Sequence, residues 1–296
     1  MIRYQNITGA LLLLIIMASC VRDGADPCPV GTLKLNLFVE KFRNVSEDPL
    51  NDKEENFYSR VNHLQYYLYK DGEFVEKMSI PLTTGTNSHY PITLKELPYG
   101  DYEIAFVANS TKNALTGDNK VCDNLVLQYQ GSENTEDYFT WIETFTVDSE
   151  DEKQKDVGLL RTQGVVRYKF YNMPPFINKF KVSLDNVHYE KRIKGDYEKT
   201  GEMAQAFTKA SIVDEDEFLS VAFPTPRKEA SKGYIYLYED GNEDTPYFTV
   251  QVNDTIVKRN HMINIESTFN NGNIDVEVSL DTEWNGTVPG GIGVVD

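Results

Sequence analysis

The sequence has few histidines and cysteines, which are frequent in catalytic and metal centres. Its 296 residues include four histidines and three cysteines. The histidines His63, His89, His188 and His261 are scattered, and no two lie at the spacing of metal ligands. The G-x-S-x-G, H-E-x-x-H, P-loop and G-x-G-x-x-G motifs are also missing. We therefore expect no enzymatic activity, no metal centre and no cofactor.

Net positive charge is missing as well. The chain has 46 acidic residues against 29 lysines and arginines, which gives a formal net charge of −17 at pH 7. Such a chain repels the phosphates of a nucleic acid, and it offers no basic patch for an anionic lipid surface. We expect no nucleic-acid partner. High net charge of one sign favours solubility at a crowded surface.

Helical periodicity is scarce, and the best helix candidate is the short segment from Gly201 to Lys209. Apolar residues instead recur at every second position, as in strands with one buried face. The strand candidates are 33–39, 64–69, 74–80, 90–94, 102–108, 125–129 and 139–147, then 166–170, 180–184, 218–223, 234–238, 247–252, 263–265 and 274–280. Two sets of short strands predict an all-β chain of two β-sandwiches, over residues 32–157 and 158–285.

Turn signals separate these strands. Asp71-Gly72 is a strong signal for a two-residue hairpin. The sequence Leu-Pro-Tyr-Gly-Asp at 97–101 predicts another turn. The charged run from Asp148 to Asp156 is typical of a solvated linker, and we place it between the two sandwiches.

One acidic turn has the beginning of a calcium loop. Asp240, Asn242 and Asp244 follow the spacing of ligand positions 1, 3 and 5. Thr245 stands where such loops need glycine, and Gln251 stands where they need a bidentate glutamate. We therefore predict a hairpin turn and no bound metal.

The N-terminus has the layout of a bacterial lipoprotein signal. Arg3 precedes an apolar run from Ile7 to Met17, and the small residues Ala18 and Ser19 precede Cys20. The run is shorter than the ~20 residues that span a bilayer. We predict a signal peptide over residues 1–19, with acyl chains on Cys20 that hold the mature chain in a membrane. An ordinary signal peptide with an incidental cysteine is the alternative.

Two cysteines remain once Cys20 carries lipid. Cys28 and Cys122 form an even pair in a chain that crosses an oxidising compartment, so we predict a disulfide between them. Two free thiols are the alternative. Cys28 would then tie the end of a short polar tether, residues 20–31, to the first sandwich.

One short motif predicts a covalent modification. Asp254-Thr255-Ile256 resembles the three-residue O-glycosylation sequence used by Bacteroidota. Because modification needs an accessible hydroxyl, we expect Thr255 in a surface turn after a strand that ends at Val252.

Taken together, these features resemble the fimbrillin superfamily of Bacteroidales, and within it the fimbrillin-A associated anchor proteins. The features that carry the resemblance are, in chain order, the signal ending at Cys20, the pair Cys28-Pro29, the strand 33–39, the turn 97–102 leading into 103–106, the stretch Leu159-Leu160-Arg161-Thr162, and Met173-Pro174-Pro175-Phe176-Ile177. The match spans nearly the whole chain and is spread over many short motifs.

The resemblance implies two tandem transthyretin-like β-sandwich domains after the lipoprotein signal. The glycine-rich sequence itself predicts a flexible tail over 286–296. The family resemblance further implies an outer-membrane surface lipoprotein in a fimbrium, whose partners are other fimbrial subunits. Such subunits join by strand complementation, in which an extended segment of one chain fills an open groove in another.

The resemblance also implies two fates for the first strand. In a polymerising subunit, a protease cuts after an arginine or lysine, and Lys41 or Arg43 offers such a site here. The first strand and the lipid on Cys20 then leave together. An anchor keeps both, and we expect an anchor or minor subunit. The alternatives are a stalk or tip subunit with an adhesive role, and a sugar-binding surface lipoprotein.

Overall fold

β-Strands make up most of the part of the chain that the structure describes. The computed structural model describes residues 28–39, 56–110, 115–129, 137–208, 217–226, 230–242, 244–270 and 273–281. Cys20, Lys41 and Arg43 lie outside these residues. Within the described ranges the helical segments are two short 3₁₀ turns, η3 (Phe57–Ser59) and η4 (Cys122–Asn124). None of the described helices is long and apolar enough to cross a membrane.

The strands form two groups along the chain. The first comprises β1 (Val30–Val39), β2 (His63–Lys70), β3 (Glu73–Pro81), β4 (Tyr90–Pro98), β5 (Gly100–Ala108), β6 (Leu115–Thr116), β7 (Val126–Gln128), β8 (Phe139–Val147) and β9 (Glu152–Arg161). The second comprises β10 (Gly164–Tyr171), β11 (Ile177–Arg192), β12 (Tyr197–Thr208), β13 (Glu217–Ala222), β14 (Ser231–Glu239), β15 (Phe248–Thr255), β16 (Met262–Asn270) and β17 (Asn273–Asp281).

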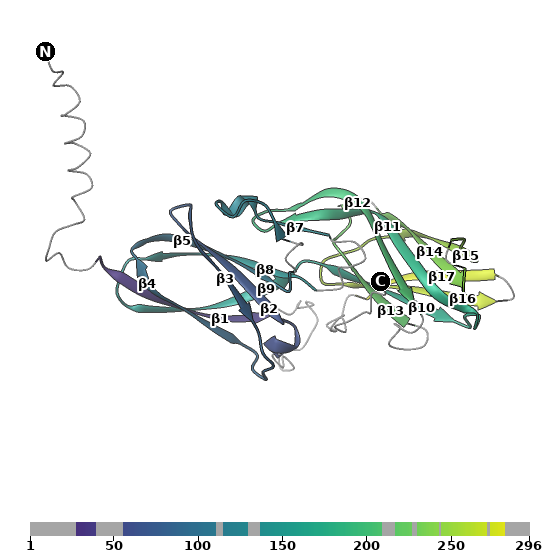
Figure 1. The fold of residues 1–296 in the computed structure, drawn as a ribbon, viewed down its shortest axis with the longest axis horizontal. Coiled ribbons are helices and arrows are strands. Elements are labelled where there is room, and N and C mark those ends of the chain that lie inside the picture. The colour runs from purple at the N-terminus through teal and green to yellow at the C-terminus, as the bar shows by residue number, and fades with distance from the viewer. Residues whose placement is uncertain are drawn as a thin grey trace, which may run out of the picture.

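The N-terminal unit consists of β1 to β5, β8 and β9. Its strands follow the order β3-β2-β5-β8-β9-β1-β4, and β8 pairs with β9 only through Phe139–Arg161 and Thr140–Leu160. One buried cluster joins leucines of β1 with side chains of β2 and β5. The sheet therefore folds over itself into two layers around that cluster, with β9, β1 and β4 on one side (Figure 1).

The C-terminal unit consists of β10 to β17, together with β6 and β7. A four-stranded sheet has the order β13-β10-β16-β17, and a six-stranded sheet has the order β15-β14-β11-β7-β6, with β12 on β11. Its core topology repeats that of the N-terminal unit. β10 is parallel to β16 and antiparallel to β13, just as β1 is parallel to β9 and antiparallel to β4.

The two units share one buried cluster where they meet. Tyr67 on β2 and Val107 on β5 face away from the N-terminal core, and they belong to the same apolar cluster as Leu127 and the C-terminal strands. β7 runs beside β11 and bridges the two units (Figure 1). The sequence placed 125–129 in the first set of strands, but β7 pairs with β11 because its buried side chains fill the space between the units.

Two sequence expectations about local structure are wrong. The charged run 148–156 is not only a linker, because residues from Glu152 on form β9 and pair with β1 while their side chains stay exposed. The boundary set at 157/158 therefore falls inside β9. The helix candidate 201–209 overlaps β12, which is held by antiparallel pairing to β11.

Two turn predictions are confirmed. Asp71 and Gly72 have φ of 50° and 83° and connect β2 to β3 directly after the pair Lys70–Glu73, as in a type I′ hairpin. The acidic segment from Asp240 is a turn between β14 and β15.

The turn at 97–101 carries β4 into β5 and crosses from one layer of the folded sheet to the other. The Tyr102 hydroxyl donates a hydrogen bond to the Pro98 carbonyl oxygen at 2.6 Å. This is the geometry of a tyrosine corner, which fixes the crossing between the layers of a Greek-key sandwich.

Candidate functional site

The first candidate site is β1 and the groove that it occupies. β1 is an inner strand, with β9 parallel to it on one side and β4 antiparallel on the other. Leu35 and Leu37 are fully buried, and Leu33 is 3% exposed. Since both neighbours hydrogen-bond to β1, its removal would leave two open strand edges flanking an apolar groove.

The side chains of β1 that face outward are held more loosely. Lys34 Nζ lies 2.8 Å from Glu152 Oε1, and the Asn36 amide donates to Asp156 Oδ1 at 3.0 Å. These contacts are exposed and contribute little free energy. The three leucines contribute more, because burying one such side chain stabilises by about 1.5–3 kcal/mol. The strand is therefore held by a periodic apolar face and by main-chain pairing.

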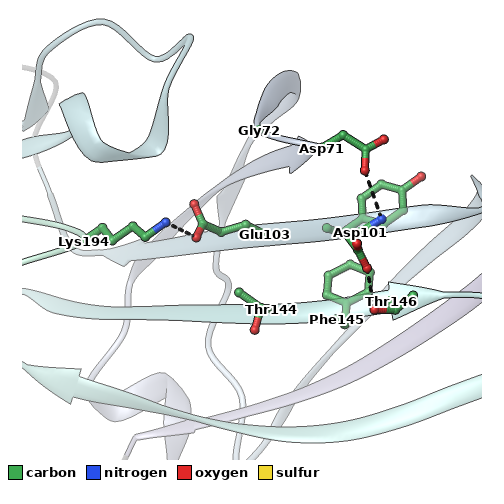
Figure 2. A pocket seen from close by; sticks show the side chains of 9 residues that line it. Asp71, Gly72, Asp101, Glu103, Thr144, Phe145, Thr146 and Lys194 are labelled. Carbon is green, nitrogen blue, oxygen red and sulfur yellow. Dashed lines mark hydrogen bonds and ion pairs between the residues drawn. The ribbon is translucent and has the colours of Figure 1, made fainter.

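The second candidate site is a polar hollow of about 570 Å³ at the junction of the two units. Figure 2 shows its walls, which come from the β2–β3 turn, β5, β8 and the turn after β11. Lys194 points at Glu103 with 2.6 Å between Nζ and Oε2, and Thr146 donates to Asp101 at 2.6 Å. Lys194 and Glu103 thus neutralise one another, and the carboxylate of Asp101 is hydrogen-bonded by a neutral hydroxyl. Residues of both units line the hollow. Among them there is no catalytic arrangement of a nucleophile with a general base.

Cys122 lies beside this hollow. Burial, and then a hydrogen bond to Glu103, raise the pKa of its thiol to about 12, so the thiol is protonated and inert at neutral pH. The ion pair with Glu103 raises the pKa of Lys194 above its ordinary value. The contacts of Cys122, Glu103 and Lys194 therefore stabilise the fold at this point.

A second ion pair also connects the two units, and it is more buried than the pair of Lys194 and Glu103. Arg161 at the end of β9 lies 2.6 Å from the carboxylate of Asp137, and their side chains are 6% and 11% exposed. The guanidinium also donates to Asn260 of the C-terminal unit at 2.9 Å and lies over the ring of Phe139. Sequence reasoning noted Arg161 within the stretch 159–162 but missed Asp137, which lies 24 residues earlier in the chain.

The predicted disulfide is not formed in the structure. Cys28 and Cys122 are free thiols, the first exposed and the second buried. Cys28 lies two residues before β1, whose first residue pairs with Pro98 at the far end of β4. Cys122 packs into the cluster shared by the two units. The two cysteines therefore belong to different packing environments.

The expected position of Thr255 is also wrong. β15 does not end at Val252 but continues to Thr255, which pairs with Ser231 and is 0% exposed. A glycan cannot be attached to a hydroxyl at that depth in the folded chain. Of the other predicted sites, Cys20, Lys41 and Arg43 lie outside the described residues.

Comparison of the whole fold with solved structures gives consistent matches. The tip fimbrial protein Mfa3 of Porphyromonas gingivalis, solved with a C-terminal truncation, matches with a TM-score of 0.52 and 13% identity, over 86% of this chain and 99% of that one. A candidate adhesin of Bacteroides thetaiotaomicron matches with a TM-score of 0.56 and 12% identity, over 88% and 98%.

A candidate cell adhesion protein of Parabacteroides distasonis also matches, with a TM-score of 0.54 and 11% identity, over 86% of this chain and 98% of that one. No protein-family description and no curated protein sequence matches the chain. The chain therefore has a fold found in fimbrial and adhesion proteins of these bacteria, over nearly its full described length.

Proposed function

We propose that this protein is a subunit of a bacterial fimbrium, an anchor or minor component held in the outer membrane by lipid on Cys20. The observation that carries the proposal is the position of β1. It is the first described strand, it lies between β4 and β9, and it buries Leu33, Leu35 and Leu37. The likeness of the fold to a fimbrial tip protein supports a place in a fimbrium.

Assembly follows from the two edges that β1 covers. If a protease cuts after Lys41 or Arg43, β1 and Cys20 leave together, and the groove between β4 and β9 accepts an extended strand of another subunit. Main-chain hydrogen bonds provide affinity, and the alternating leucine sockets set the register. If the chain stays uncut, β1 fills its own groove and the lipid keeps the subunit in the membrane. We favour the uncut form.

The experiment is to determine the N-terminus of the protein in fimbriae isolated from native cells. An anchor is expected to carry a lipidated Cys20 followed by an intact β1. A new terminus at Phe42 or Asn44 would refute the anchor and assign a polymerising stalk or tip subunit. Absence of the protein from purified fimbriae would refute fimbrial assembly altogether. Cys20→Ala is the matched control, because it should release the chain from the membrane without changing the folded units.

A second measurement tests the groove directly. Leu35→Asp places a charge where the side chain has no exposure, whereas Lys34→Gln changes a partly exposed neighbour on the same strand. Leu35→Asp should strip β1 from its groove and make it sensitive to proteases, while Lys34→Gln should leave it protected. Equal protection in both variants would show that the leucines do not hold the strand.

A further inference from the structure

The outer face of one sheet in the C-terminal unit carries a row of aromatic side chains. In the sheet of β12, β11, β14 and β15, alternate residues point inward, and Phe180, Ile235 and Leu237 are buried in the core. Tyr234, Tyr236 and Tyr238 stand at the intervening positions of β14 and point outward, where they are partly exposed. This sheet forms the upper layer of the right-hand unit in Figure 1.

Lysines on the neighbouring strand follow the same repeat. Lys179 is paired with Tyr238 and Lys181 with Tyr236 in the register of β11 against β14. Lys181 Nζ lies 5.9 Å from the centre of the Tyr236 ring, and the rings of Tyr234 and Tyr236 are 6.1 Å apart and inclined by 19°. A lysine–tyrosine pair thus repeats along the strands, with about 6.6–6.8 Å between successive pairs.

The positions in the same rows on β11, β12 and β15 carry no acidic group. The residues that flank these pairs are Ala204, Ala206, Ser183, Thr249 and Gln251. The short alanine side chains project little from β12, and the threonine and glutamine on β15 offer hydrogen-bonding groups. The formal net charge of the chain is −17, whereas the two charged residues in these rows, Lys179 and Lys181, are both basic.

The aromatic row continues to the end of the sheet. Tyr247 directly precedes β15, has the outward parity of Thr249, and is 54% exposed. Its ring packs edge-on against Phe176, which is 38% exposed, with 4.9 Å between the ring centres. Exposed aromatic groups gathered in this way mark binding surfaces more often than isolated ones do.

We propose that this face binds a linear polysaccharide that carries carboxylates, such as a polyuronate, laid along β14. A sugar ring has an apolar C–H face that stacks on a tyrosine and hydroxyls that bond to side chains such as Gln251. The carboxylate of a uronic acid pairs with a lysine ammonium. Because the two lysine–tyrosine pairs lie in successive rows of the same face, they suit a ligand whose units repeat. The proposal uses one sheet face and stands whether or not the chain joins a fimbrium.

The test measures binding of the purified full chain to polygalacturonate, alginate and hyaluronan, with fully methyl-esterified polygalacturonate as the uncharged counterpart. Tyr236→Ala and Lys181→Ala should each weaken binding to at least one polyuronate by tenfold or more, and Tyr236→Phe should retain it. The loss in Lys181→Ala should disappear on the esterified polymer, and it should shrink as salt is added.

The chain offers a matched control on the opposite sheet. Lys169 lies 5.3 Å from the ring of Tyr171 on β10, so Tyr171→Ala and Lys169→Ala remove the same chemistry outside the row. These variants should bind like the unmodified protein, and thermal melts should confirm that every variant is folded. Failure of all three polyuronates to bind would overturn the proposal. Equal losses in the control variants, or equal affinity for the esterified polymer, would overturn it too.

Discussion

The buried pair between Arg161 and Asp137 makes a quantitative prediction about how the two units are held together. Nε and Oδ2 are 2.6 Å apart in surroundings that leave 6% and 11% of the two side chains exposed. Removing one partner strands the other charge away from water, which costs about 3–5 kcal/mol. Arg161→Met should therefore lower the free energy of unfolding by about that amount, a large part of the ~5–15 kcal/mol that a typical domain has.

The double variant separates pairing from general damage. Asp137→Asn removes the charge and keeps the shape, so Arg161→Met with Asp137→Asn leaves no stranded ion. We expect the double variant to lose at least about 1 kcal/mol less than the sum of the single losses, as contacting residues usually do. The matched control is the pair Lys153–Asp148, 2.5 Å apart with side chains 44% and 67% exposed, where solvent screening should make the coupling much weaker than in the buried pair.

Urea unfolding and calorimetry provide the measurements. Because Arg161 also binds Asn260 in the C-terminal unit, its loss should split one calorimetric transition into two, as the units begin to unfold separately. Single losses below 1 kcal/mol, together with strict additivity in the double variant, would refute the reasoning. The junction would then depend on the shared apolar cluster alone.

Three further outcomes are expected. In native protein, iodoacetamide should alkylate the exposed Cys28 and spare the buried Cys122 until the chain is denatured. If both thiols were protected until a reductant was added, the two cysteines would form the predicted disulfide after all. Burial lowers the pKa of Lys191 to about 8, below its unfolded value of ~10.4. Between these pH values the unfolded chain binds more protons, so the free energy of unfolding, compared with that of Lys191→Met, should rise from pH 8 to ~10.4. A difference that does not change with pH would contradict this. Tyr102→Phe removes the bond to Pro98 and should cost about 0.5–1.5 kcal/mol in urea unfolding, whereas an unchanged midpoint would mean that the corner is held by packing.

The sequence predicts strands well where one face is apolar and the other polar. β1 and β10 show this, since their alternating residues are buried as expected. It predicts poorly where a strand is held by its backbone alone. The first five residues of β9 are all exposed and polar, so their side chains carry no signal, and only the pairing with β1 makes them a strand.

Contacts that are distant in the chain are equally invisible to local patterns. β7 has three residues, and nothing local indicates that it leaves its own unit to pair with β11. The partner of Arg161 lies in a stretch with no strand signal. The sequence drew attention to Arg161 only as part of the stretch 159–162 that carries the family resemblance, and only the fold brings Asp137 and Asn260 to it.

The repeated topology of the two units bears on the proposal that β1 is the strand that is exchanged. β10 has the same neighbours in its own unit, parallel β16 and antiparallel β13. β10, however, follows β9 through Thr162 and Gln163, which are 1% and 0% exposed, so a protease has no access to that connection. β1 follows a polar tether, and the basic residues Lys41 and Arg43 come soon after it in the sequence. Each unit thus has an equivalent first strand, β1 or β10. The buried connection from β9 holds β10 in place, so removal of β10 would disturb the junction of the units. Removal of β1 would leave that junction intact.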